Sequence, residues 1–506
     1  DVTTWTIGNV IGDDGTTAGT MNVAGGTFVL DTAVVDGTTV FDTREVLNND
    51  SGVELRGLVI QPSANFTNGT VTFIDGATAA NIDAADVTGL ASVTDTALTD
   101  FTINATAAVA DVTITATAKA ADTTASALGI STNQATAMHK VMEAAISGDT
   151  TLMSTLNDSL TGVNSGLAQT TTDLAKQASP QTDLISGSSV AAQAVTGSVQ
   201  GIMSNRMASL RSGDAYYGTG VAAGGMSAQS GFIQVFGSTA EQESTKVGSG
   251  TQAGFDTESQ GVAIGFDGAT DNGMTVGVSV STANTDVDGK GTGKSTNEID
   301  TYSASLYMDT ATDNGYFEGS LTYGLNENST SRKITSAGLN RTLTGSYDSN
   351  TISLNLAAGM PNEVGAGYLT PFGSFTATVM DIDPYTEKST VTDDALRLKV
   401  AQDDVSSMVG TVGLKFHGEM SNGGMPMISL AINNEFGDNT INSTNTFQGG
   451  GTAFKTSTAV EELSATLGLG YSYGTDSTSI EFAYEADAND DDYLSHYGSI
   501  KIVGKF

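Results

Sequence analysis

From about residue 230 to the end of the chain, apolar and polar residues alternate with a period of two. In "MTVGVSVS" (274–281), every second residue is apolar, and the residues between them are Thr, Gly or Ser. This alternation predicts β-strands that have one apolar and one polar face. About twelve such runs occur, as in a β-barrel of moderate size. Further examples are "TYSASLYMD" (301–309), "TISLNLA" (351–357), "LSATLGLGYSY" (463–473) and "SIEFAY" (479–484).

The residue types on the two faces favour a barrel in a membrane over a soluble sandwich. The polar face is mostly Ser, Thr, Gly and Asn, whereas a sandwich would present many Lys and Glu to water. The apolar face is rich in Leu, Val and Ile with interspersed Tyr and Phe, which suits lipid and its aromatic girdles. A closed barrel also leaves no unpaired strand edge in lipid.

The connections between the predicted strands alternate between short and long. Outer-membrane barrels have short periplasmic turns and long external loops, so this alternation is a second indication of the same fold. The short connections are 268–273, 310–315, 361–367, 419–424 and 474–477. The long ones lie near 240–251, 284–297, 327–343, 382–403, 438–456 and 486–493.

Two segments before the barrel have helical spacing. "TNQATAMHKVMEAAISG" (132–148) predicts an amphipathic linker helix that ends at a glycine. Its apolar positions are Met138, Val141, Met142, Ala145 and Ile146. Residues 188–212 predict a slim helix of roughly 37 Å, long enough to thread a bilayer inside a barrel. Its aligned positions are Val195, Val199, Ile202, Arg206 and Leu210, followed by Arg211. An ordinary surface linker helix is the alternative for this second segment.

Residues 1–125 contain short runs rich in Val, Ile, Thr and Phe, separated by Gly, Asn and Asp. Their spacing of about 12 to 17 residues fits the rungs of a β-solenoid. The chain is therefore expected to be mainly β. It divides into a β-rich, solenoid-like passenger (1–125), a helical linker region (126–187), a pore-threading helix (188–212) and a twelve-stranded antiparallel transmembrane β-barrel (213–506).

Composition narrows the range of functions. The formal net charge of -37 argues against nucleic-acid binding, which needs Lys and Arg to neutralise phosphates. The chain has no cysteine, which excludes disulfides and thiolate chemistry. A run of about 18 apolar residues is absent, so no spanning helix is expected. The chain opens at Asp1 without a basic and apolar leader, which suggests a mature or trimmed form.

One stretch, "DGKGTGKST" (288–296), resembles a phosphate-binding loop. That motif requires glycine, four residues, and then Gly-Lys-Ser or Gly-Lys-Thr. Counting back from Gly293 places Asp288 where the first glycine should be, and an acidic side chain there would repel the anion. The stretch also falls in a long loop, and a strand-to-helix turn is what nucleotide binding needs. We expect an external loop tip here and no ATPase.

Other chemistry is sparse. Residues 1–125 lack histidine, so a Ser-His-Asp hydrolase is excluded there, and we expect no enzymatic activity and no cofactor. His139, His417 and His496 are too scattered in the sequence for a metal site. In "DANDDD" (487–492), alternating Asp487, Asn489 and Asp491 form a weak candidate cation site in an external loop, because the glycine and glutamate of an EF-hand are missing.

The order of these segments resembles a monomeric (type Va) autotransporter. The resemblance rests on the "TNQ" helix, "ASPQ" (178–181), "NRMASLRSGD" (205–214), the opening strand "GFIQVFG" (231–237) and a terminal aromatic residue. "GVAIGFDG" (261–268) and "YGSIKIVGKF" (497–506) are most similar to the surface-cell-antigen type of alphaproteobacterial adhesin. This resemblance implies a twelve-stranded barrel in the outer membrane of a Gram-negative bacterium, a helix in its pore, and a passenger exported for adhesion or surface coverage. A porin-like channel with a soluble N-terminal appendage is the alternative.

The resemblance also implies partners. Outer-membrane lipid surrounds such barrels, and their assembly machinery recognises a terminal strand, here Ile500, Ile502 and Phe506. If Phe506 ends at the periplasm, strand parity makes the pore helix run from the outside inwards. We therefore expect Arg206 or Arg211 to pair with Glu318 or Glu481 in the periplasmic half of the lumen. A surface or host ligand of the passenger is a further expected partner, whose identity the sequence does not give.

Overall fold

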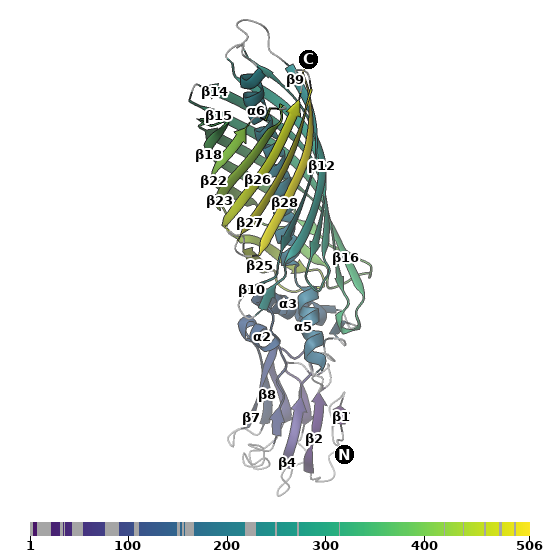
Figure 1. Ribbon diagram of the computed structural model, residues 1–506. Coiled ribbons are helices and arrows are strands. Elements are labelled where there is room, and N and C mark those ends of the chain that lie inside the picture. Colours follow the sequence, from purple (N-terminus) through teal and green to yellow (C-terminus); the bar gives the residue numbers. More distant parts are fainter. Residues whose placement is uncertain are drawn as a thin grey trace.

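The computed structural model is elongated, with a β-barrel at one end, a small β-rich unit at the other and helices between them (Figure 1). It describes residues 4–7, 22–30, 34, 36–42, 54–75, 91–105, 111–148, 152–153, 156, 166–217, 229–247, 250–270, 273–312, 314–418, 420–421, 423–438, 440–459, 462–474, 478–489 and 492–505.

Twelve strands in the described part of the chain form one antiparallel sheet that closes on itself. Closure comes from β28 pairing with β9, where Ile500 lies opposite Val235. The strands in order are β9 (Gln229–Gln242), β12 (Phe255–Ala269), β13 (Thr275–Gly289), β14 (Thr296–Thr312), β15 (Gly315–Ile334), β16 (Arg341–Gly359), β18 (Gly367–Ile382), β22 (Val405–Gly418), β23 (Met425–Glu435), β26 (Leu463–Gly474), β27 (Thr478–Asn489) and β28 (Tyr493–Lys505). The barrel expected from the sequence is confirmed.

Strand β13 illustrates why the alternation identifies the two surfaces of the wall. Val276, Val278 and Val280 are exposed on the outside, at 42%, 50% and 61%. Between them, Gly277 and Ser279 face the lumen and are buried. An outer surface of bare Val, Leu, Ile and Phe is stable only against hydrocarbon.

The strands continue well beyond the apolar band. On β13 the outward positions change from valine to Thr282, Asn284, Asp286 and Asp288, so the strand leaves the hydrocarbon region before it ends. The loop expected at 284–297 is thus shortened to 290–295. The sequence boundary was wrong because a polar outward face was interpreted as a loop, although backbone pairing continues there.

Other long connections also contain strands. Two of them together build a four-stranded sheet of β19 (Tyr385–Thr386), β21 (Leu398–Gln402), β24 (Thr440–Phe447) and β25 (Phe454–Ala459). Shorter additions are β10 (Thr245–Val247), β11 (Gly250–Gln252), β17 (Asn362–Val364), β20 (Lys388–Ser389) and the 3-10 turn η1 (Ser336–Gly338).

Four helices connect the β-rich unit with the barrel: α2 (Ala121–Leu128), α3 (Thr132–Gly148), α5 (Gly166–Ala178) and α6 (Thr182–Tyr217). A reciprocal cap begins α3, because Ser131 Oγ accepts the Gln134 N–H at 3.2 Å and Gln134 Oε1 accepts the Ser131 N–H at 3.0 Å. Helix α6 is longer than the 188–212 expected, since it begins directly after Pro180 and continues across Gly187. No helix in the described ranges has the length and hydropathy of a membrane span.

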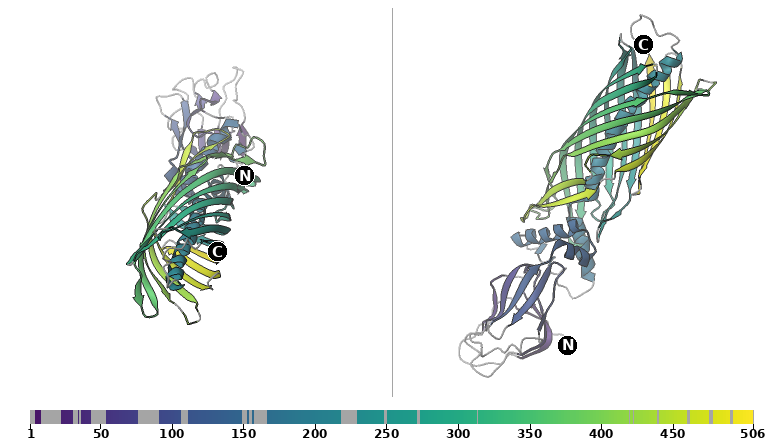
Figure 2. Two further views of the ribbon diagram at one scale, coloured as in Figure 1. Left: turned by 90° about the horizontal axis from the view of Figure 1, so that it is seen from above. Right: turned by 90° about the vertical axis from the view of Figure 1, so that its left-hand side faces the viewer.

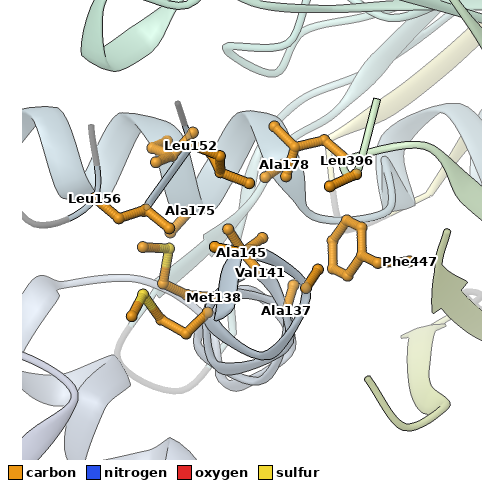
Figure 3. Packing of buried hydrophobic residues seen from close by; sticks show 14 of the residues in the cluster. Ala137, Met138, Val141, Ala145, Leu152, Leu156, Ala175, Ala178, Leu396 and Phe447 are labelled. Carbon is orange, nitrogen blue, oxygen red and sulfur yellow. The ribbon is translucent and has the colours of Figure 1, made fainter. Parts of the chain in front are cut away.

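One hydrophobic cluster joins the three parts of the molecule (Figure 3). Met138, Val141 and Ala145 of α3 pack with α5 and with the barrel's external sheet, which contributes Leu396 and Phe447. Ala64 and Leu98 of the β-rich unit belong to the same cluster. The expected core face of α3 was wrong at one position, because Ile146 is 48% exposed.

The β-rich unit contains two four-stranded sheets. One, β1 (Thr4–Ile7), β2 (Asn22–Leu30), β4 (Glu54–Gln61) and β6 (Ala91–Val93), is parallel throughout. The other is β3 (Thr39–Asp42), β5 (Gly69–Asp75), β8 (Asp111–Ala118) and β7 (Thr99–Ala105), in which β3 and β5 are parallel and the rest antiparallel.

Parallel partners in this unit lie one coil apart in the sequence. Leu58 pairs with Ala91 and Thr39 pairs with Thr72, so one coil takes 33 residues. The spacing of about 12 to 17 residues read from the sequence separates strands of opposite sheets, and it was wrong as a rung repeat.

Candidate functional site

Helix α6 runs lengthwise through the barrel (Figure 2). Its predicted apolar stripe is buried against the lumen wall, with Val195, Val199 and Ile202 each no more than 2% exposed. Leu210, near the far end of the helix, is half-buried. Their wall partners include Phe232, Phe236, Ala263, Ala283, Tyr307 and Val503. The chain thus enters the lumen at the linker end and leaves it near the start of β9.

The helix does not occupy the lumen evenly. It packs against the wall formed by β12 to β16. On another side, beside Ser209 and Arg211, the structure has a cavity of about 650 Å³. Its lining includes Lys415, Tyr471 and Glu481. The lumen is therefore packed on one wall and open on the other.

Arg206 forms a buried ion pair with Asp267 on β12. Its Nε lies 2.7 Å from Oδ2, its Nη2 lies 2.9 Å from Oδ1, and both side chains are almost fully buried. Arg206 also donates to Ser230, and the Tyr307 hydroxyl donates to Asp267 at 2.9 Å. A bidentate pair with further donors is the geometry in which burial of two charges is tolerated. The expected pairing of Arg206 with Glu318 or Glu481 was therefore wrong.

Sequence reasoning missed Asp267, although a signal was present. Ala263, Gly265 and Asp267 alternate on the polar face of β12, so the carboxylate had to face the lumen. Its position just before a short connection was read as part of the turn.

Arg211 has the type of partner that the sequence led us to expect. Its Nη1 lies 2.8 Å from Glu318 Oε2, and it also pairs with Asp309. The guanidinium stacks over the ring of Tyr316 at 3.7 Å from its centroid. Ser204, one turn before Asp267's partner, donates to the other oxygen of Glu318.

Glu481 is also engaged by the helix, but not through an arginine. Its Oε2 accepts the Ser209 hydroxyl at 2.8 Å and lies 2.7 Å from Lys501 Nζ. Glu481 and Lys501 are direct neighbours on β27 and β28, on the lumen face of the strands next to the closure. The two carboxylates Glu318 and Glu481 thus hold α6 from different walls.

The predicted assembly residues lie on the lipid face. Ile500 and Ile502 are 42% and 49% exposed on the outside of β28. Phe506 lies outside the described residues.

The weak cation-site candidate is not assembled in the described part of the chain. Asp487 Oδ1 accepts the Thr466 hydroxyl at 2.8 Å on the lumen side, while Asn489 Oδ1 accepts the Tyr493 N–H at 3.1 Å. Asp491 lies outside the described residues, and among the others no group of three or more metal-ligating side chains is found. The loop interpretation was wrong for Asp487 because β27 continues to Asn489 and turns this carboxylate inwards.

A closed twelve-stranded barrel with a bare apolar outer face and a helix through its lumen defines an outer-membrane translocator. Residues 231–485 match the family described as "Autotransporter beta-domain", and the chain belongs to that family. Its barrel is therefore an outer-membrane domain for export and anchoring.

Solved structures have the same fold at low identity. The translocator domain of autotransporter NalP from Neisseria meningitidis is 18% identical, with a TM-score of 0.48 over 64% of this chain and 99% of that chain. The transport unit of autotransporter AIDA-I from Escherichia coli is 12% identical, with a TM-score of 0.43 over 60% and 98%. The beta domain of the Bordetella autotransporter BrkA is 17% identical, with a TM-score of 0.39 over 55% and 100%. No curated protein matches the chain.

Proposed function

We propose that the barrel exports the β-rich unit to the cell surface and keeps it there as a non-enzymatic passenger for adhesion or surface coverage. The observation that carries this proposal is the path of α6. The helix links a unit beyond one end of the barrel to β9, whose first residues pair with the last strand at the other end (Figure 1). With the terminal strand ending at the periplasm, the passenger is outside.

The passenger's own structure supports a binding or spacing role. Its parallel strands and 33-residue offset suit a β-solenoid, a rod that extends by stacking coils. The absence of histidine from residues 1–125 supports a role without hydrolytic chemistry. A surface or host ligand is the proposed partner, and the charge of -37 disfavours nucleic acid.

Two further partners follow from the barrel. The outward Val, Leu, Ile and Phe side chains suit outer-membrane lipid. We assign recognition by the barrel-assembly machinery to the terminal strand, whose Ile500 and Ile502 are exposed along its outer face. The finer resemblance to surface-cell-antigen adhesins belongs to this proposal.

Protease shaving of intact cells tests the proposed location. One antibody recognises residues 1–125 and a second recognises the barrel. We expect the first signal to disappear while the second survives, with a permeabilised sample as the control for protease access. Protection of both signals in intact cells, together with loss of the first in permeabilised cells, would overturn a surface passenger.

A porin-like channel is the second candidate, and the cavity of about 650 Å³ beside α6 is the observation in its favour. The ion pairs of Arg206 and Arg211 argue against it, because they hold the helix inside the lumen. Bilayer recordings of the purified protein distinguish the two: a steady open conductance fits a porin, and a low conductance fits a plugged translocator.

A further inference from the structure

The glycine-rich loop that resembles a nucleotide motif binds an anion from its own chain. The Gly291 N–H donates to Asp183 Oδ2 at 3.0 Å, and Ser295 Oγ lies 3.4 Å from the same oxygen. Asp183 stands in the first turn of α6, and its side chain is 3% exposed as a residue in the folded chain. The loop thus holds a carboxylate through backbone and hydroxyl donors.

Glycine is required in this loop by the closeness of the partner. A Cβ on Gly291 would lie 2.8 Å from Asp183 Oδ2, and one on Gly293 would lie 2.6 Å from Gln181 Oε1. Side chains at these positions would displace the two residues that fill the loop. Alternate glycines at 289, 291 and 293 therefore make room for the turn between α5 and α6.

A second loop contacts the end of α5. Gln177 Oε1 accepts the backbone N–H groups of Thr335 at 2.8 Å and Ser336 at 3.0 Å, in the connection between β15 and β16. Its Nε2 donates to the Thr292 carbonyl at 3.3 Å. One glutamine side chain therefore bridges two external connections of the barrel.

A buried arginine completes the arrangement. Arg332 on β15 donates through Nη1 to the carbonyl oxygens of Gln177 at 2.8 Å and Ala178 at 3.3 Å, at the C-terminal end of α5. Glu387, in the connection after β18, holds the guanidinium through both oxygens at 2.6 and 2.8 Å. A cation at a helix C-terminus meets the negative end of the helix dipole.

These contacts converge on one short segment, residues 177–183, which we call the elbow. Three different external connections of the barrel supply its partners. The elbow immediately precedes the pore helix, so a force pulling on the passenger reaches the elbow before it reaches α6. The elbow can meet these loops only once it lies beyond the lumen on the passenger side.

We propose that the external loops are a receptor that captures the elbow after export and bears the load on the passenger. This inference rests on the proposed function, because it requires the passenger to leave through the barrel. The receptor is distinct from the ion pairs in the lumen: it holds the chain outside the pore, whereas Arg206 and Arg211 hold the helix inside it.

Limited trypsin digestion of the full chain in outer membranes tests the receptor. Lys176 lies at the edge of the elbow, so cleavage after it, detected as a fragment beginning at Gln177, reports release of the elbow. The variants are Gly291→Ala, Asp183→Ala and the double variant. Gly324→Ala is the matched control, because a Cβ there meets nothing closer than 3.8 Å.

We expect each single variant to be cut about tenfold faster than the unaltered chain, as for the loss of one hydrogen bond to a charged group. The double variant should be cut no faster than the faster single variant, because both changes remove the same contact. The control should match the unaltered chain.

Unchanged cleavage in both single variants, or additive acceleration in the double variant, would overturn the receptor. If Gly291→Ala does not assemble a heat-modifiable barrel, Asp183→Ala alone decides: faster cleavage supports the receptor and unchanged cleavage contradicts it. Surface exposure of residues 1–125 is measured in the same cells. Its absence in every variant counts against the proposed function, whereas a surface passenger with unchanged cleavage counts against the receptor alone.

Discussion

Arg206 of the pore helix binds both carboxylate oxygens of Asp267 on the barrel wall, at 2.7 and 2.9 Å. Both groups are buried, so neither charge has water as a substitute for its partner. Such a pair fixes the position of a helix, since displacement of the helix would leave two uncompensated charges.

Replacing Arg206 by methionine should therefore loosen the plug. Removing one member of a buried pair costs about 3–5 kcal/mol, and we expect a higher and noisier conductance in planar bilayers. The double variant Arg206→Met, Asp267→Leu should recover much of the low conductance, because no charge is left unpaired. A single variant as quiet as the unaltered protein would contradict this role.

Glu481→Gln should weaken the barrel next to its closing strand pair. The change leaves Lys501 buried without its ion-pair partner on the adjacent strand. We expect a loss of about 3–5 kcal/mol, seen as a lower temperature for heat modification in SDS gels. Lys501→Met combined with Glu481→Leu should be less damaging than Glu481→Gln. The reverse order would show that the pair does not stabilise this part of the barrel.

Phe447→Ala should detach the linker helices while leaving the barrel closed. Phe447 is 2% exposed in the shared core and stacks on Phe454, with ring centroids 5.7 Å apart. Truncating a buried phenylalanine costs about 3–5 kcal/mol. We expect faster proteolysis in α3 and α5 with normal heat modification of the barrel. Phe436→Ala, at a side chain that is 65% exposed, is the control.

The linker should become less stable on acidification. Burial lowers the pKa of His139 below its usual 6.5, with Lys140 acting in the same direction. The His139 ring contacts Thr124 Oγ1 at 3.1 Å. The unfolded linker takes up the proton first, so this stability is full above about pH 6.5 and is lost as the pH falls towards the lowered pKa.

Thiol labelling can measure that loss, because the chain has no cysteine of its own. A cysteine placed by Ala145→Cys in the core of α3 should react faster at pH 5.5 than at pH 7.5, after normalisation to an unfolded peptide. Adding His139→Gln should remove this pH dependence. An unchanged pH dependence in the double variant would show that another group is responsible.

The barrel was predictable because its signal is local. On each strand, lipid and lumen demand opposite residue types at alternate positions, and Val276 to Val280 display that rule directly. The apolar stripe of α6 was predictable for the same reason. What failed was the extent of the strands, because a polar outward face such as Asp286 and Asp288 carries no information about backbone pairing.

The partners of the lumen charges were only partly predictable. Arg211 with Glu318 followed from strand parity and residue type. Asp267 and Asp183 did not, because their roles depend on which strand or loop the helix leans on. Period-two patterns assign a side chain to a face, but they do not give its neighbour across a lumen.

The coils of the passenger stack with a constant offset of 33 residues, and in the described residues the linker core reaches only Ala64 and Leu98 of that unit. Additional coils inserted before these residues would meet neither the linker nor the barrel. Passenger length is thus structurally uncoupled from anchoring. In evolutionary terms, duplication of one coil could lengthen the reach of this protein while every residue that seats, plugs and holds it stays the same.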